Sequence, residues 1–180
     1  RKPDLVVSGI NYGENPATDI TLSGTVGAAL EAASHGIPAL SVSLELHNED
    51  YLGYSRDIDF STAAVFTRRF ARLLLEKKMP ADVHVLNVNV PAHATPDTPW
   101  RVTRLARHGY FVPFLKDPAE TGGAPRIDAT RNPHPDDLAD LQTDVHTFYR
   151  EKLVSVTPLS LDLTSRVDLV ELQSSFGTLD

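Results

Sequence analysis

Three short apolar segments, separated by helical ones, restrict the fold of this chain more than any other feature. They span residues 4–10, 38–44 and 83–90, and each is rich in Val, Leu or Ile. Apolar residues recur at helical spacing between them, over about residues 23–35 and 59–78. Continuous apolar strands that alternate with helices are typical of a parallel sheet covered on both faces. The sequence therefore predicts an α/β fold with a mostly parallel sheet.

The segment after the first strand combines glycines with polar side chains. In open parallel sheets, ligands bind beyond the carboxyl ends of the strands, which is where this segment must lie. Asn11 stands at the end of the strand and offers an amide oxygen, which is a suitable ligand for Mg²⁺. Gly9 and Gly13 allow positive φ angles and a close approach of the backbone to a ligand. We therefore expect a cation site at this loop.

The helix that begins at Ser23 has the features of a phosphate site. Its free N–H groups and its positive dipole end attract anions. The hydroxyls of Ser23 and Thr25 add donors, and Gly24 leaves room for an oxygen. Together with Asn11, this pattern indicates metal-assisted phosphate chemistry. A simpler interpretation stays open, because a Ser-capped helix after a glycine-rich loop is common, and the segment matches neither a Walker P-loop nor a dinucleotide fingerprint.

Composition narrows the class of protein. The 180 residues fit a single domain, and the formal charge of −7 argues against nucleic-acid and membrane-surface partners. The chain contains no cysteine, which excludes disulfides and thiolate metal sites and favours a cytoplasmic location. The chain begins at Arg1 and its first strand follows at once, so we expect it to be the interior of a longer protein.

The motifs resemble those of the SurE family, the stationary-phase survival proteins. The segment PDLVVSGINYGENPATDITLSGTVGAALEA is close to the family pattern S-G-I-N-x-G-x-N-x-G-x-D-x-x-Y-S-G-T-V-x-A-A, and GIPALSVSL, LNVNVP, VTRLAR and VSVTPLSLDLT follow in the family's order. The resemblance implies one domain: a three-layer Rossmann-like core over residues 1–91, with a β-rich extension over residues 92–180 that serves as an oligomerisation arm. It also implies a 5′-nucleotidase that uses one divalent metal ion, Mg²⁺ or Mn²⁺. Such an enzyme hydrolyses nucleoside 5′-monophosphates, with some action on 3′-nucleotides and polyphosphate, as a homodimer or homotetramer.

The resemblance also assigns site residues. The metal ligand is Asn11, the phosphate-binding residues are Ser23, Gly24 and Thr25, and the loop is shaped by Gly9, Gly13, Asn15 and Asp19. The other family ligands, an Asp-Asp pair and a serine, have no counterpart here, so the catalytic carboxylates are expected upstream of this chain. The one Asp-Asp pair, Asp136-Asp137, follows a proline and is typical of a helix start. A non-catalytic phospholigand-binding or assembly module therefore stays open as an alternative.

The second half of the chain is less regular. Residues 101–110 alternate like a half-exposed strand, residues 116–140 have the composition of a long loop, and residues 153–164 and 166–176 predict a strand and a short helix. The histidines lack metal-binding spacing and are expected to be structural or exposed, with His35 satisfying carbonyls at a helix end. His108 is the best remaining candidate for a chemical role, because it ends a strand beside a glycine.

Overall fold

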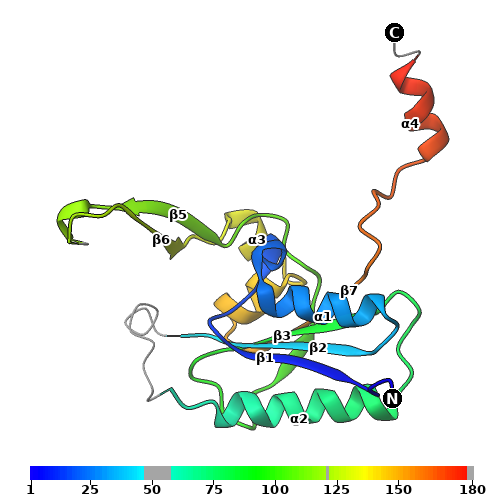
Figure 1. The fold of residues 1–180 in the computed structure, drawn as a ribbon, viewed down its shortest axis with the longest axis horizontal. Helices are drawn as coiled ribbons and strands as arrows, with labels where there is room; N and C mark the ends of the chain where they lie inside the picture. Colours follow the sequence, from blue (N-terminus) through cyan, green and yellow to red (C-terminus); the bar gives the residue numbers. More distant parts are fainter. Residues whose placement is uncertain (47–57, 121, 178–180) are drawn as a thin grey trace.

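A five-stranded sheet with helices on both faces forms the body of the protein (Figure 1). The computed structural model describes residues 1–46, 58–120 and 122–177. In spatial order, the strands of the sheet are β1 (Val6–Tyr12), β2 (Ala39–Leu44), β3 (Val85–Val90), β7 (Val154–Leu159) and β4 (Trp100–Val102). β1, β2 and β3 are parallel, β7 runs antiparallel to β3, and β4 is parallel to β7. The predicted α/β fold with a mostly parallel sheet in three layers is confirmed.

The helices of the body are the two that the apolar periodicity predicts. They are α1 (Gly24–Ser34) and α2 (Ser61–Glu76), and they lie on opposite faces of the sheet (Figure 1). The ends of these helices and of β1, β2 and β3 differ from the predicted ends by at most two residues.

Side-chain alternation along the strands decides what each helix covers. On one face, the apolar side chains of β2 and β3 pack against the apolar stripe of α2, which consists of Ala63, Phe66, Phe70 and Leu74. On the other face, the apolar side chains of α1 pack against Ala39 and Val85 at the amino ends of β2 and β3, and against Leu159, which is paired with Val85 from the antiparallel strand β7. Toward the carboxyl ends, that same face carries buried serine, threonine and asparagine side chains instead. The sheet therefore has a polar half-face beneath the predicted binding loop.

The boundary expected at residue 91 does not separate two sheets, because β4 and β7 join the sheet of the body. The predicted long loop over residues 116–140 is wrong in large part. A hairpin of β5 (Phe111–Lys116) and β6 (Arg126–Arg131) is followed by the short helix α3 (Pro135–Ala139). Pro113 stands in β5, which is tolerated because both strands of a two-stranded ribbon are edge strands. The predicted helix start at Asp136-Asp137 is confirmed, with both residues in the first turn of α3.

The predicted strand over residues 101–110 is also wrong beyond Val102. Thr103 and Arg104 still donate their N–H groups to the carbonyls of Val156 and Gln142. From Ala106 on, the acceptors are carboxylates rather than a neighbouring strand, which is why the strand does not continue. These contacts are Ala106 to Asp144, Arg107 and His108 to Asp137, and Tyr110 and Phe111 to Asp19.

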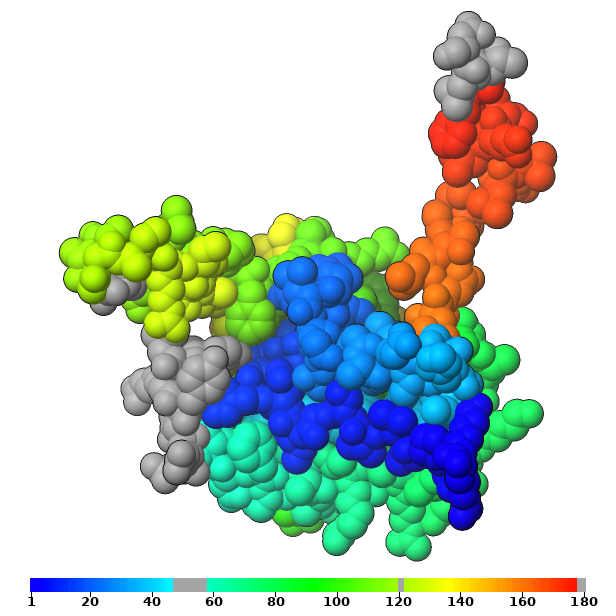
Figure 2. All heavy atoms as spheres, viewed as in Figure 1, coloured from blue at the N-terminus to red at the C-terminus, as the bar shows by residue number. Residues whose placement is uncertain are grey.

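After β7 the chain leaves the body and ends in the predicted helix, α4 (Leu169–Phe176), while the strand itself is shorter than predicted. Every residue of α4 is exposed. Figure 2 shows this segment and the β5–β6 hairpin projecting from the body in different directions. No helix within the described ranges is long and apolar enough to cross a membrane.

Candidate functional site

The carboxyl ends of the parallel strands carry a row of polar side chains. Asn11 of β1 is in register with Ser43 of β2, and Ser43 is in register with Asn89 of β3. The Asn11 amide nitrogen donates to the carbonyl of Gly13 at 2.7 Å. No described residue donates a hydrogen bond to the Asn11 amide oxygen. The side chain is therefore held in place while its oxygen stays available to a ligand.

Two glycines allow the backbone to form this loop. Gly9 has a φ of +120°, and a Cβ atom there would lie 2.4 Å from the carbonyl oxygen of Val42 in β2. Gly13, which holds the Asn11 amide, has a φ of +111°. Side chains are strongly disfavoured at such angles, so the close contact between β1 and β2 requires Gly9 in particular.

Asn15 fixes the loop to the polar half-face of the sheet. Its amide nitrogen donates to the Ser43 hydroxyl at 2.7 Å, and its backbone N–H donates to the Asn89 side chain at 2.8 Å. Its carbonyl accepts from the side chains of Asn87 and Asn89. Ser41 in turn donates to Asn87 at 2.9 Å, so each buried amide has partners. The alternation Ser-x-Ser and Asn-x-Asn in two otherwise apolar strands is the sequence signal for this network, and our sequence analysis overlooked it.

The start of α1 lies over this edge of the sheet (Figure 1). The Ser23 hydroxyl oxygen accepts from the N–H of Val26 at 3.2 Å, which caps the helix and leaves the hydroxyl proton available. The N–H groups of Gly24 and Thr25 donate to no residue in the described part of the chain. A Cβ atom at Gly24 would have nothing within 4 Å. The helix therefore presents two unused N–H groups and open space beside Gly24.

Between the loop and α1, a 3₁₀ helix (Ala17–Leu22) is held by two acidic residues. The Asp19 carboxylate accepts from the N–H groups of Tyr110 and Phe111. Ala17, at a φ of 55°, donates its N–H to the fully buried Asp144 at 2.8 Å. Burial raises the pKa of Asp144 to about 6, in spite of three backbone N–H donors that act in the opposite direction.

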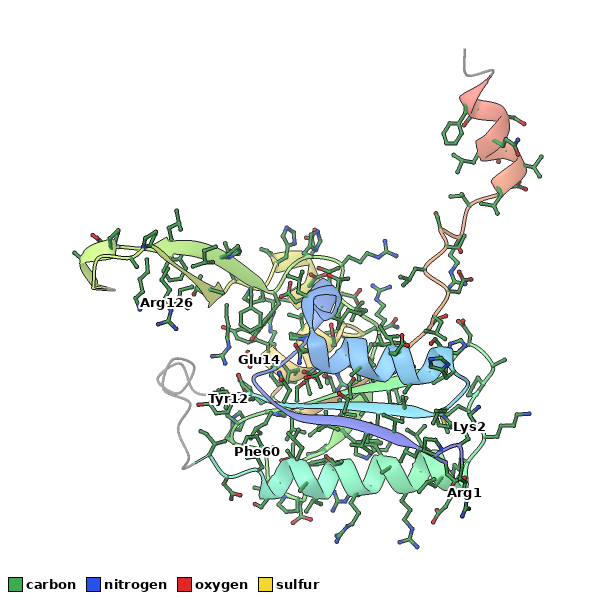
Figure 3. All side chains as sticks on the ribbon, viewed as in Figure 1. Arg1, Lys2, Tyr12, Glu14, Phe60 and Arg126 are labelled. Carbon is green, nitrogen blue, oxygen red and sulfur yellow. The ribbon has the colours of Figure 1, made fainter. Side chains whose placement is uncertain are left out.

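A buried ion pair ties the same loop to the hairpin. Glu14 follows Gly13 and its side chain is fully buried, and the Arg131 Nε of β6 lies 2.5 Å from its Oε1. Arg131 also donates to the carbonyl of Leu46 at 2.6 Å. Figure 3 shows Glu14 between the body and the hairpin.

The structure places the histidines differently from the expectation in one respect. His35 does not satisfy helix-end carbonyls with its ring; its Nε2 lies 3.2 Å from the Glu31 carboxylate on the exposed surface. Among the described residues, one group of three or more His, Asp or Glu side chains has metal-binding proximity. That group consists of His108, His134 and Asp136, so it does not include a residue of the Asn11 loop.

Comparison with known proteins agrees with the fold described above. The family model described as "Survival protein SurE" matches residues 1–111. The chain is 45% identical to the 5′-nucleotidase SurE of Thermococcus gammatolerans over 95% of this chain and 63% of the relative, and 43% identical to that of Thermococcus kodakarensis over 94% and 64%. The crystal structure of the SurE protein from Aquifex aeolicus superposes with a TM-score of 0.70 at 32% identity, over 98% of this chain and 66% of the other. The chain thus spans just under two thirds of the length of these relatives.

Proposed function

The chain belongs to the SurE family, and from this premise we propose that the protein is a metal-dependent phosphomonoesterase acting on nucleoside 5′-monophosphates, and also on 3′-nucleotides and polyphosphate. The observation that carries the proposal is the pairing of two features at one edge of the sheet. Among the described residues, the Asn11 amide oxygen has no donor and two N–H groups at the start of α1 have no acceptor. The first suits a hard cation and the second suits a phosphate. Two of the compared relatives carry the name 5′-nucleotidase SurE.

Asn11 fits a divalent ion as one ligand. Its oxygen accepts no hydrogen bond from the described part of the chain, and the bond from its amide nitrogen to Gly13 fixes its direction. One neutral amide is not sufficient, because carboxylates supply most of the charge in sites for Mg²⁺ and Mn²⁺. The Asp-Asp pair that the family resemblance implies upstream is our candidate for those ligands. When bound, the ion supplies electrostatic stabilisation of the phosphoryl oxygens in the transition state.

The residues of α1 act on the phosphate group itself. The N–H groups of Gly24 and Thr25 donate to its oxygens, the Ser23 hydroxyl adds a donor, and the helix dipole favours the charge. These donors are fixed before substrate arrives, because Ser23 caps the helix and Asp19 holds the 3₁₀ helix in front of it. Substrate preference is expected to depend on Ala17 and Leu22, which stand where the family pattern has a glycine and a tyrosine.

The experiment compares two glycine substitutions. Gly24→Ala and Gly27→Ala each add a methyl group that meets nothing within 4 Å, and neither glycine has a positive φ. Both proteins should fold, yet only Gly24→Ala places its methyl where the phosphate is expected. We expect the KM for AMP to rise about tenfold or more in Gly24→Ala, equivalent to about 1.4 kcal/mol or more, and to stay unchanged in Gly27→Ala. Equal KM values in both variants would refute the phosphate site.

The metal ligand and the alternative function are tested separately. Asn11→Ala should strongly lower AMP hydrolysis at a fixed Mn²⁺ concentration, and unchanged rates across a Mn²⁺ titration would contradict the assignment. Calorimetric titration with AMP, with and without Mn²⁺, addresses the non-catalytic module. Metal-independent AMP binding without hydrolysis would favour that module over the enzyme.

We also infer that the extension over residues 92–180 mediates a homodimer or homotetramer, and that its projecting end, residues 161–176, makes the contact. Apolar side chains along residues 161–176 are exposed, including Leu163 at 92%, Val170 at 76% and Phe176 at 62%. Such a surface on a segment that projects from the body is costly in water unless another surface covers it. Light scattering that gives a monomer at micromolar concentration would refute this inference.

A further inference from the structure

Two histidines and an aspartate meet at the base of the β5–β6 hairpin. His108, His134 and Asp136 each offer one ligand atom, and these atoms lie within 4.8 Å of one another. His108 precedes β5 and His134 follows β6, so the cluster joins the two ends of the hairpin. We propose that this cluster binds a divalent transition-metal ion, with Zn²⁺ as its probe, at a site separate from the Asn11 loop.

His108 is oriented as a metal ligand. Its Nδ1 lies 3.0 Å from the carboxylate of Asp137, and that side chain is only 8% exposed. Asp137 also accepts the backbone N–H groups of Arg107 and His108, so it is fixed independently of the ring. A carboxylate at Nδ1 places the ring proton there and leaves the lone pair of Nε2 for a metal. Metal-binding histidines usually have such a carboxylate or carbonyl partner on the other ring nitrogen, which orients the ring and strengthens the ligand.

His134 and Asp136 supply the other two ligands. The ring of His134 stacks on that of His108, with centroids 3.8 Å apart and planes inclined by 16°. The in-plane lone pairs of the two rings are therefore nearly parallel, and one ring must turn about its side-chain torsions for both to bind one ion. His134 Nδ1 lies 3.7 Å from the Asp136 carboxylate oxygen. Zinc bonds to nitrogen and oxygen ligands measure roughly 2.0–2.2 Å, so two atoms at that separation fit on one ion. The present partner of His134 Nδ1 is the N–H of Asp136 at 3.3 Å, a long hydrogen bond that a metal would replace.

The ligand types favour zinc or a similar ion over magnesium. Imidazole nitrogen is a ligand for Zn²⁺, Cu²⁺ and Ni²⁺, whereas Mg²⁺ selects oxygen. The His108 and His134 side chains are 45% and 43% exposed, so an ion reaches them from solvent and water completes its coordination. Two arginines line a cavity of about 230 Å³ beside the cluster, and one of them, Arg104, is paired with Asp140. Asp136 and Asp137 outweigh the remaining charge of Arg107.

A bound ion would clamp the hairpin at its base. His108 lies in the segment that Asp137 and Asp144 hold by backbone hydrogen bonds, and His134 is the N-cap of α3. Joining these two positions restrains both strands where they leave the body. The site is therefore structural, and it acts on the hairpin rather than on the phosphate.

The test is a calorimetric titration of the untagged protein with Zn²⁺ in excess Mg²⁺, which occupies oxygen-rich sites. The wild type is compared with His108→Ala/His134→Ala, with Asp136→Asn, and with His93→Ala as the control for an exposed loop histidine. We expect the double variant to bind one zinc ion fewer, Asp136→Asn to bind that ion about tenfold more weakly or worse, and His93→Ala to match the wild type.

Co²⁺ provides a second measurement. Its visible absorption in the wild type should indicate nitrogen and oxygen ligands, and this absorption should be lost in the double variant while circular dichroism shows the fold retained. The proposal is overturned if the double variant binds as many zinc ions with the same affinity, or if His93→Ala loses as much as the double variant does. Asn11→Ala should keep this zinc site, so failure of the phosphatase proposal would not affect the result.

Discussion

Burial of the Asp144 carboxylate predicts an unusual pH dependence of stability. Its pKa is about 6 in the folded protein against an ordinary value of 3.8, and burial is the main cause. The folded state therefore binds a proton more tightly than the unfolded state does. Stability from this group is fully present below pH 3.8 and is lost as the pH rises through about 6. At 1.36 kcal/mol for each pKa unit, the loss amounts to about 3 kcal/mol.

Asp144→Asn removes the titration and keeps the shape of the side chain. The variant retains one acceptor oxygen for the N–H groups of Ala106 and Val145, but it loses the oxygen that accepts from Ala17. That loss costs roughly 1–3 kcal/mol at every pH. The difference in unfolding free energy between variant and wild type isolates the titration. Between acid and neutral pH, we expect the unfolding free energy of the variant, minus that of the wild type, to rise by about 3 kcal/mol.

Urea unfolding followed by fluorescence gives this difference curve. Trp100 is the single tryptophan, and its ring contacts Phe70 of the core at a centroid distance of 5.3 Å, so it reports on the body. Asp97→Asn, which changes an exposed carboxylate, is the control variant. A flat difference curve for Asp144→Asn would show that burial does not dominate the pKa of Asp144. A step of opposite sign would show that the three N–H donors outweigh burial.

Three further substitutions test the packing around the site. Gly9→Ala should lower the unfolding free energy by at least about 2 kcal/mol, because its Cβ would meet the Val42 carbonyl at a positive φ; an unchanged urea midpoint would refute this. Arg131→Ala removes the cation beside the buried Glu14 carboxylate and should cost roughly 3–5 kcal/mol, measured by thermal unfolding, and a loss below about 1 kcal/mol would show that the pair is not desolvated. Ser155→Ala should raise stability by about 1 kcal/mol, because the buried hydroxyl finds no partner among the described residues; calorimetry showing a loss would indicate a partner such as a buried water.

The first half of the chain was predictable because its signals are local. Apolar periodicity places β1, α1, β2, α2 and β3, and the loop that holds Asn11 and Ser23 follows from the strand and helix beside it. The hairpin was missed because its strands are mostly exposed and β5 contains Pro113, so they lack the alternation of a half-buried strand.

The cluster at the base of the hairpin could not be found by spacing. His108 and His134 are far apart in the sequence, and only the antiparallel pairing of β5 and β6 brings them together. The anchors of the loop are non-local in the same way. Several residues that hold the loop, such as Asp144, Asn87 and Asn89, are of types that also form exposed turns, so composition does not distinguish the two uses.

The carboxylate contacts around the 3₁₀ helix set the order in which the site can be completed. The bond from Ala17 to Asp144 spans 127 positions, the ion pair from Glu14 to Arg131 spans 117, and the bond from Tyr110 to Asp19 spans 91. During synthesis, the phosphate loop emerges well before Asp144, and it lacks these anchors until Asp144 has left the ribosome. Loop closure over such distances is entropically costly, and it is offset only when the late segments pack. The binding loop is thus made long before the residues that anchor it.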